Sequence, residues 1–444
     1  METPQSPALL RSMGRWTLTA LVINSIIGSG IFGLPSIVAG YLGRRSPLAY
    51  LIAAAGIAVI LACFAELASQ FGASGGPYLY TREAFGRFVG VEVGWLQWAI
   101  KVTAAAAAAI VFEDYLVEFW PAAREPAVRL AVLTLLVGVL AATNIRGIKS
   151  GALANNFFTV AKLAPLFFFA IGGVVFILRR HPVVAAIPRP VASFPARNWF
   201  EAVILLTFPF GGFEGAVVPM AEVKNVRRDA PFALFVGLAT VAAVYCAIQL
   251  VVVSVLPNPA LSDRPLADAA RQMWGPAGAS LMSLGALVSV YGFLTALMLH
   301  MPRLMLALGE KGDFPRVLAR IHPRFRTPHV STLAFAVVIW CLAAVGTFQG
   351  NVLLSSVGRL LVYGFTCAAL PVLRRKKPHA PSYRLPAGNL VAAVGVFLVA
   401  LLASRLTHVE ALAFLVAVLL AVASWVWSRF ARFDASRSYR HQDR

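Results

Sequence analysis

Charged residues are scarce in this chain of 444 residues: they make up 13% of it, about half the share usual in soluble globular proteins. Cysteine is rarer still. The four thiols, Cys63, Cys246, Cys341 and Cys367, all lie inside apolar runs, so we expect buried side chains and no disulfide framework. The seven histidines are scattered in loops and span ends. We therefore expect no metal site, no cofactor and no catalytic residue.

Apolar residues are correspondingly abundant. They make up 59% of the chain, and the mean hydropathy is +0.76. So few charged residues cannot cover this much apolar surface in water, which excludes a soluble enzyme, a disordered chain and a free nucleic-acid binder. A membrane helix needs only about 20 apolar residues, so the chain can cross a bilayer many times. Twelve spans are predicted, at about 16–41, 47–71, 88–119, 127–143, 153–178, 199–221, 231–256, 276–308, 329–348, 351–373, 388–405 and 409–430. The fold class is an all-α integral membrane protein in a single domain, residues 1–444.

The net charge of +20 resembles a nucleic-acid signal, but in a chain with many spans basic residues gather in cytoplasmic loops. With the N-terminus inside, 25 of the 39 Lys and Arg residues fall on the cytoplasmic side. We therefore expect both termini in the cytoplasm, a plasma membrane or inner membrane location, a lipid bilayer as surroundings and no nucleic-acid partner. Nothing in the sequence indicates an obligatory protein partner.

Two predicted spans are interrupted by helix-breaking residues. The first contains Gly28-Ser29-Gly30, and the sixth contains Phe208-Pro209-Phe210-Gly211-Gly212. Close helix packing through small residues would explain one such span. Two of them, five spans apart, favour a transporter built from inverted repeats, in which broken helices form the substrate site.

A broken helix suits an amino acid because its two half-helix ends differ in charge. The amides of Gly28, Ser29 and Gly30, with the Ser29 hydroxyl, are suited to a carboxylate. The carbonyls of Ile26 and Ile27 are suited to an ammonium group. The sequence therefore predicts a zwitterion site at this break.

Ionisable residues inside spans are costly and are functional candidates. Lys162 lies about ten residues into the fifth span, roughly 15 Å at 1.5 Å per residue, too deep to reach the interface easily. It can replace a bound sodium ion or take and release a proton. Glu214, after the second break, is interpreted as a cap of the half-helix or as a proton-coupling group. Lys101 is expected to pair with Glu92 or with substrate.

Two further charges have simpler interpretations or none. Glu66 lies near the inner end of the second span, where we expect interfacial solvation. Arg359 lies near the middle of the tenth span, and no partner for it is evident from the sequence.

These residues give the chain a family likeness. From about residue 13 to 430 it resembles the amino acid–polyamine–organocation family of permeases, particularly prokaryotic relatives of L-type amino acid exchangers. Five segments in this order carry the resemblance: Ile27–Phe32; Ala65–Ala68 with Ser74–Tyr80 and Ala84–Gly86; Ala161–Leu163; Phe213-Glu214 with Glu222–Asn225; and Arg303 with Gly312–Pro315 and Thr327-Pro328.

The resemblance implies the 5+5 inverted-repeat fold of leucine transporters. Its repeats would span about 16–178 and 199–373, with two added helices at 388–430. It also implies amino acid transport by alternating access. Ser29 and Gly30 would bind the substrate carboxylate, and Ile26, Gly211 and the Phe208 region the amino group. Phe208 would act as an aromatic gate. Lys162 would take the sodium position of sodium-dependent relatives.

The chain departs from the family pattern at a few positions. Val226 follows Asn225 where proline is usual, and a lysine at Lys101 is not general. The apolar segment Phe208–Gly212 carries no acid for a cationic side chain, which favours neutral amino acids over arginine or polyamines. We expect sodium-independent proton symport or exchange of neutral amino acids. The alternatives are a polytopic membrane enzyme, a channel, or a permease for polyamines or other organic cations.

Overall fold

Helices occupy the predicted membrane spans as far as the structure describes the chain. The computed structural model describes residues 13–71, 75–147, 152–179, 195–218, 220–310, 312–378 and 383–406, with a few positions between 412 and 423. The predicted twelfth span, 409–430, lies almost entirely outside these residues. Within them, seven helical stretches are long and apolar enough to cross a membrane, and two further apolar helices, His329–Val345 and Gly388–Ala403, are shorter.

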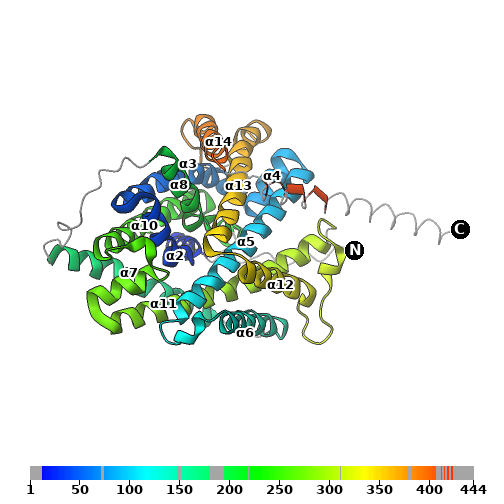
Figure 1. Ribbon diagram of the computed structural model, residues 1–444. Helices are drawn as coiled ribbons and strands as arrows, with labels where there is room; N and C mark the ends of the chain where they lie inside the picture. The colour runs from blue at the N-terminus through cyan, green and yellow to red at the C-terminus, as the bar shows by residue number, and fades with distance from the viewer. Residues whose placement is uncertain are drawn as a thin grey trace.

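The helices follow the order of the predicted spans, with short helices between them. In the first half they are α1 (Arg15–Ile26), α2 (Gly30–Leu42), α3 (Ser46–Gln70), α4 (Gly76–Phe85), α5 (Arg87–Leu116), α6 (Pro126–Ile145) and α7 (Ala152–Arg179). In the second half they are α8 (Ala196–Phe210), α9 (Phe213–Ala216), α10 (Val226–Val255), α11 (Pro265–Glu310), α12 (His329–Val345), α13 (Phe348–Lys376) and α14 (Gly388–Ala403). Figure 1 shows these helices and their packing.

Three local features differ from the sequence expectation. The loop before α5 contains a ten-residue helix, α4, which begins with Gly76-Pro77 because proline fits the first turn. The connection expected at 257–275 is helical from Pro265, and α11 continues through a kink at Gly275, where φ is +72°. Cys341 is exposed, whereas Cys63 and Cys367 are buried as expected and Cys246 is partly buried.

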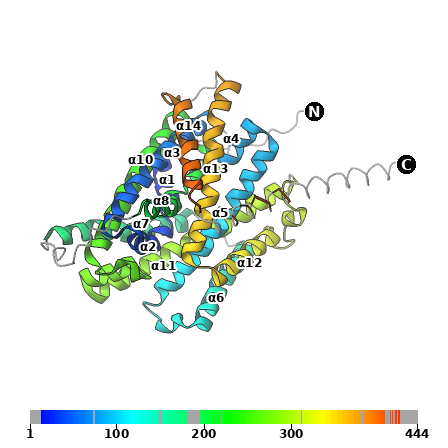
Figure 2. The same cartoon turned by 45° about the horizontal axis from the view of Figure 1, so that its top comes forward.

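The core lies around α5, which packs against α11 and α13. Six consecutive alanines, Ala104–Ala109, are at most 1% exposed on this helix. Small side chains let membrane helices approach closely, so this run brings α11 and α13 near the centre of the molecule. Figures 1 and 2 agree in placing α6 beside α12 at one edge, away from this core.

The two interrupted spans lie side by side in opposite directions. α1 packs on α9 and α2 packs on α8, so the first half of one span meets the second half of the other. α10 covers α1 and α3, and α13 covers α8. The ends of four half-helices therefore meet at one place inside the bundle.

Candidate functional site

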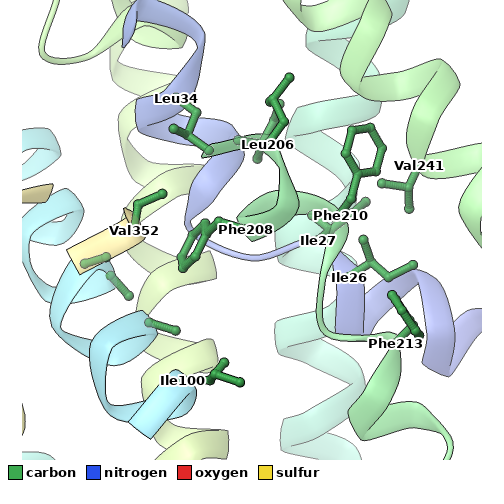
Figure 3. Close-up of a cluster of buried hydrophobic side chains, with 14 of the residues drawn as sticks. Ile26, Ile27, Leu34, Ile100, Leu206, Phe208, Phe210, Phe213, Val241 and Val352 are labelled. Atoms are coloured by element: carbon green, nitrogen blue, oxygen red, sulfur yellow. The ribbon is translucent and has the colours of Figure 1, made fainter. Parts of the chain in front are cut away.

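The first break separates α1 from α2 at residues 27–29. Ile27 leaves the helix with an extended backbone, φ −68° and ψ 107°, and its N–H donates to the Ile23 carbonyl oxygen at 3.0 Å. Figure 3 shows Ile27 on the extended link between the two half-helices. The Ser29 side chain is 1% exposed, and its Oγ has no hydrogen-bond partner in the described part of the chain. A buried hydroxyl without a partner at the start of a half-helix is suited to bind an anionic ligand group.

The second break separates α8 from α9 at Gly211 and Gly212. Gly211 ends α8, and its N–H donates to the carbonyl oxygens of Thr207 and Phe208. Gly212 has φ +110°, a conformation that L side chains rarely adopt. A β-carbon there would also collide with the backbone oxygen of Ser25. Position 212 therefore requires glycine for two reasons: the backbone conformation there, and the close approach of the end of α1.

The two breaks are joined by close contacts. A β-carbon on Gly30 would lie 2.8 Å from Cδ1 of Phe208 and 3.1 Å from Cβ of Pro209. The Tyr245 hydroxyl lies 3.5 Å from the Ile26 carbonyl oxygen and 3.3 Å from that of Pro209. The structure therefore brings Ile26, Ile27, Gly28, Ser29 and Gly30 together with the end of α8.

The aromatic residues at the end of α8 point to different sides. In Figure 3 Phe208 lies toward Val352 and Ile100, whereas Phe210 lies toward Val241. The ring of Phe210 is 5.4 Å from that of Tyr245 between centroids. Phe208 therefore borders the first break, and Phe210 is part of the packing against α10.

Glu214 is the centre of a buried charged cluster. Its Oε2 accepts a hydrogen bond from the Gly212 N–H at 2.6 Å and one from the Tyr363 hydroxyl at 3.3 Å. Its Oε1 lies 3.2 Å from Lys101 Nζ and 3.6 Å from Arg359 Nε. The carboxylate therefore caps the start of α9 and holds two cations, which fits the capping interpretation of this residue.

Lys101 and Arg359 thus have a shared partner that the sequence did not suggest. Lys101 pairs with Glu214 and not with Glu92. Glu92 lies at another position on α5 and is 9% exposed. Arg359 is 4% exposed and donates from Nη1 to the Phe208 carbonyl oxygen. Its guanidinium lies 5.1 Å from the Phe208 ring centroid, at cation–π distance. The only sequence signal for Arg359 is a charge within an apolar run.

Lys162 contacts the end of the first half-helix. It is 6% exposed, and its Nζ donates to the Asn24 carbonyl oxygen at 2.6 Å. That carbonyl belongs to the last turn of α1, where helix carbonyls lack partners within the helix and carry partial negative charge. The lysine therefore supplies a positive charge beside the first break.

Glu66 differs from its expected role. Its side chain is fully buried and accepts two hydrogen bonds from Arg374, at 2.7 and 2.6 Å. It also accepts one from the Leu385 N–H at 2.8 Å. Interfacial solvation is therefore the wrong interpretation: Glu66 ties α3 to the end of α13 and to the segment that leads into α14.

An apolar cavity of about 280 Å³ lies between α3, α8, α13 and α14, lined by residues such as Ile57, Trp199 and Leu401. Its nearly apolar lining offers little to a zwitterion, so the breaks are the better candidate for a polar ligand. Among the residues that the structure describes, no three His, Cys, Asp or Glu side chains are grouped to hold a metal ion.

The chain is similar to known proteins over most of its length. The amino acid permease family model matches residues 13–430. The chain is 26% identical to a methylthioribose transporter of Bacillus subtilis, covering 86% of this chain and 85% of the relative. It is 25% identical to the branched-chain amino acid permease BcaP of the same organism, covering 96% and 95%.

A third relative is the serine/threonine exchanger SteT of Bacillus subtilis. It is 26% identical over 85% of this chain and 87% of its own length. The names of the three relatives describe different substrates. The substrate of this chain must therefore be argued from its own residues.

Proposed function

The chain belongs to the amino acid permease family, and we propose that it is a secondary active transporter that carries amino acids across the cell membrane by alternating access. The observation that carries this proposal is the meeting of two broken helices at Ser29, Gly30 and Phe208. We also propose that residues 16–178 and 199–373 are its inverted repeats. The antiparallel packing of α1 on α9 and α2 on α8 supports that assignment.

The proposed binding mode uses both half-helix ends. The substrate carboxylate binds the amides at Gly28–Gly30 and the unpartnered Ser29 hydroxyl, where the start of α2 carries partial positive charge. The amino group binds carbonyls around Ile26 and Ile27 and at the end of α8, near Phe208 and Gly211. Phe208 lies against Gly30 and would cover the bound ligand as a gate.

Sodium independence is proposed from Lys162. Its ammonium bonds a free carbonyl of α1, as a coordinated cation would, so a fixed charge replaces a bound ion. Transport would then be coupled to protons or proceed as exchange, with Lys162 and Glu214 as the coupling groups. Lys101, which holds Glu214, takes part in the same cluster.

Cationic substrates are disfavoured on electrostatic grounds. The one carboxylate found at the second break, Glu214, already faces two cations. Polyamines and other organic cations would meet repulsion from Lys101 and Arg359, so that alternative is weaker. The expectation of neutral substrates stays a prediction, because the pairing of Glu214 with two cations disfavours cationic side chains without separating neutral from acidic ones.

An enzyme is the weaker alternative to a transporter. Its chemistry would need clustered acids, histidines or thiols, whereas the buried acid Glu214 is engaged in pairing and capping. The location we propose is a cell membrane, crossed many times, with both termini in the cytoplasm. The distribution of Lys and Arg between the two sides supports that orientation.

Uptake into proteoliposomes tests the proposal. The purified chain is reconstituted, sodium is replaced by choline, and radiolabelled amino acids are offered with and without an inward proton gradient. We expect saturable uptake of at least one amino acid that unlabelled substrate inhibits. No saturable uptake or exchange of any amino acid would contradict the proposed function.

A further inference from the structure

Buried positive charge exceeds negative charge beside the second break. Lys101 and Arg359 are full cations, and Glu214 is the one full anion that the structure places between them. The end of α8 adds about half an elementary negative charge near the Phe208 carbonyl. An excess of roughly half a positive charge therefore stays buried among α5, α8 and α13.

Donors without partners mark the same place. Ser356 Oγ is buried and has no hydrogen-bond partner among the residues that the structure describes, and Arg359 Nε makes no hydrogen bond there, although it lies 3.6 Å from Glu214 Oε1 in an ion pair. Ser356 lies three positions before Arg359 on α13, so both face the same side of that helix. Val352, four positions before Ser356, lies beside Phe208 in Figure 3. This face of α13 therefore presents unsatisfied donors toward the end of α8.

The ring of Phe208 connects this region with the proposed carboxylate site. One side of the ring touches Gly30, and the Arg359 guanidinium lies 5.1 Å from its centroid. A ligand held by its α-carboxylate at Gly28–Gly30 would extend its side chain past Phe208 toward Arg359 and Lys101. The far end of that side chain would meet excess positive charge and the unpartnered Ser356 hydroxyl.

We propose that the side-chain end of the substrate site binds an anionic group, so the transported amino acid carries a carboxylate side chain, as glutamate and aspartate do. This inference rests on the proposed function and revises the expectation of neutral side chains. A side-chain carboxylate would balance the excess charge and accept hydrogen bonds from Arg359 Nε and Ser356 Oγ. An apolar side chain would leave those buried donors unpaired, a neutral amide could accept from them without balancing the excess charge, and a cationic side chain would add repulsion.

Glutamine is the matched probe, because it has nearly the shape of glutamate without the charge. Equilibrium binding of L-glutamate and L-glutamine is measured on the full-length chain in detergent, with aspartate and asparagine as a second pair. We expect the dissociation constant for glutamate to be at least tenfold lower than that for glutamine. A ratio of one or less, with glutamine bound, would overturn this inference and leave the proposed function standing.

Two variants test which residues set the ratio. Lys101→Met and Arg359→Gln each remove one cation, and we expect the glutamate preference to fall at least tenfold in either. Arg197→Gln removes a cation on an exposed side chain at the start of α8, the end away from the second break, and should leave the ratio as in wild type. An unchanged ratio in a folded Lys101→Met or Arg359→Gln protein would overturn the assignment.

The outcomes separate the two proposals. If Arg359→Gln fails to fold, the anionic side-chain site is still tested by Lys101→Met and by the ratio of the glutamine and glutamate dissociation constants in the wild type. If no amino acid binds or is taken up, the proposed function itself fails. Uptake of neutral amino acids that glutamate does not inhibit contradicts the anionic side-chain site alone.

Discussion

Lys162 Nζ donates a hydrogen bond of 2.6 Å to the carbonyl oxygen of Asn24, 138 residues earlier in the chain. The contact ties α7 to the last turn of α1, directly before the first break. A carbonyl at the end of a helix is a natural partner for a cation. The protein therefore carries its own positive charge where an unwound helix would otherwise attract an ion.

Lys162→Ala removes that charge and should impair transport more than binding. The lysine contacts α1 and not the proposed ligand position, so we expect uptake to fall at least tenfold and substrate affinity to change little. The measurement is uptake with sodium or choline, alongside equilibrium binding. Strict sodium dependence of the wild type, or unaltered uptake by the variant, would show that Lys162 has another role.

Glu214→Gln should destabilise the protein strongly. It removes the negative partner of Lys101 and Arg359 while both cations stay buried, and breaking a buried ion pair in this way costs about 3–5 kcal/mol. Thermal unfolding in detergent measures the loss. Glu201→Gln, which breaks the partly exposed pair with Arg197, is the control and should cost at most about 1 kcal/mol. Equal melting temperatures for the two variants would contradict the central position of Glu214.

Gly212→Ala should lower stability more than Gly275→Ala. Both glycines have positive φ, +110° and +72°, so alanine is strained at either site by about 1–3 kcal/mol. At Gly212 the new β-carbon would also collide with the backbone of Ser25. At Gly275 nothing lies within 4 Å of the new β-carbon. The difference between the two melting temperatures isolates the contact between the breaks. A Gly275 variant that is equally or more unstable would show that this contact is loose.

Local sequence patterns predict the backbone of the site well. Gly28-Ser29-Gly30 and Pro209 with Gly211-Gly212 interrupt apolar runs, and helices end at both places in the structure. The depth of Lys162 in its span likewise predicts a buried ammonium, whereas its contact with α1 depends on packing. These features depend on residues close together in sequence, so their physical signal is visible without the fold.

The charged cluster could not be predicted in this way. Lys101 and Glu214 are 113 residues apart, and which charges meet depends on how α5, α9 and α13 pack. The sequence therefore shows no partner for Arg359, and it predicts a solvated Glu66 because the partner of Glu66, Arg374, lies 308 residues further along. The contact between Gly30 and Phe208 also depends on packing, because it sets two half-helices from opposite halves of the chain against each other.

Gly30→Val tests whether this contact lies at the substrate site. A β-carbon at Gly30 would meet Phe208 at 2.8 Å, so valine must displace the ring from its place beside the first break. We expect transport to fall at least a hundredfold while the variant is still produced and folded. Gly138→Val is the matched control, because Gly138 lies on the exposed side of α6 with nothing within 4 Å.

Counterflow is the most direct measurement of the central claim that amino acids cross the membrane through the two breaks. Proteoliposomes preloaded with unlabelled amino acid are diluted into sodium-free buffer with a trace of the labelled form. Wild type and Gly138→Val should accumulate label above its equilibrium level, and Gly30→Val should not. Accumulation by Gly30→Val equal to that of the wild type, or none by the wild type with any amino acid, would contradict the claim.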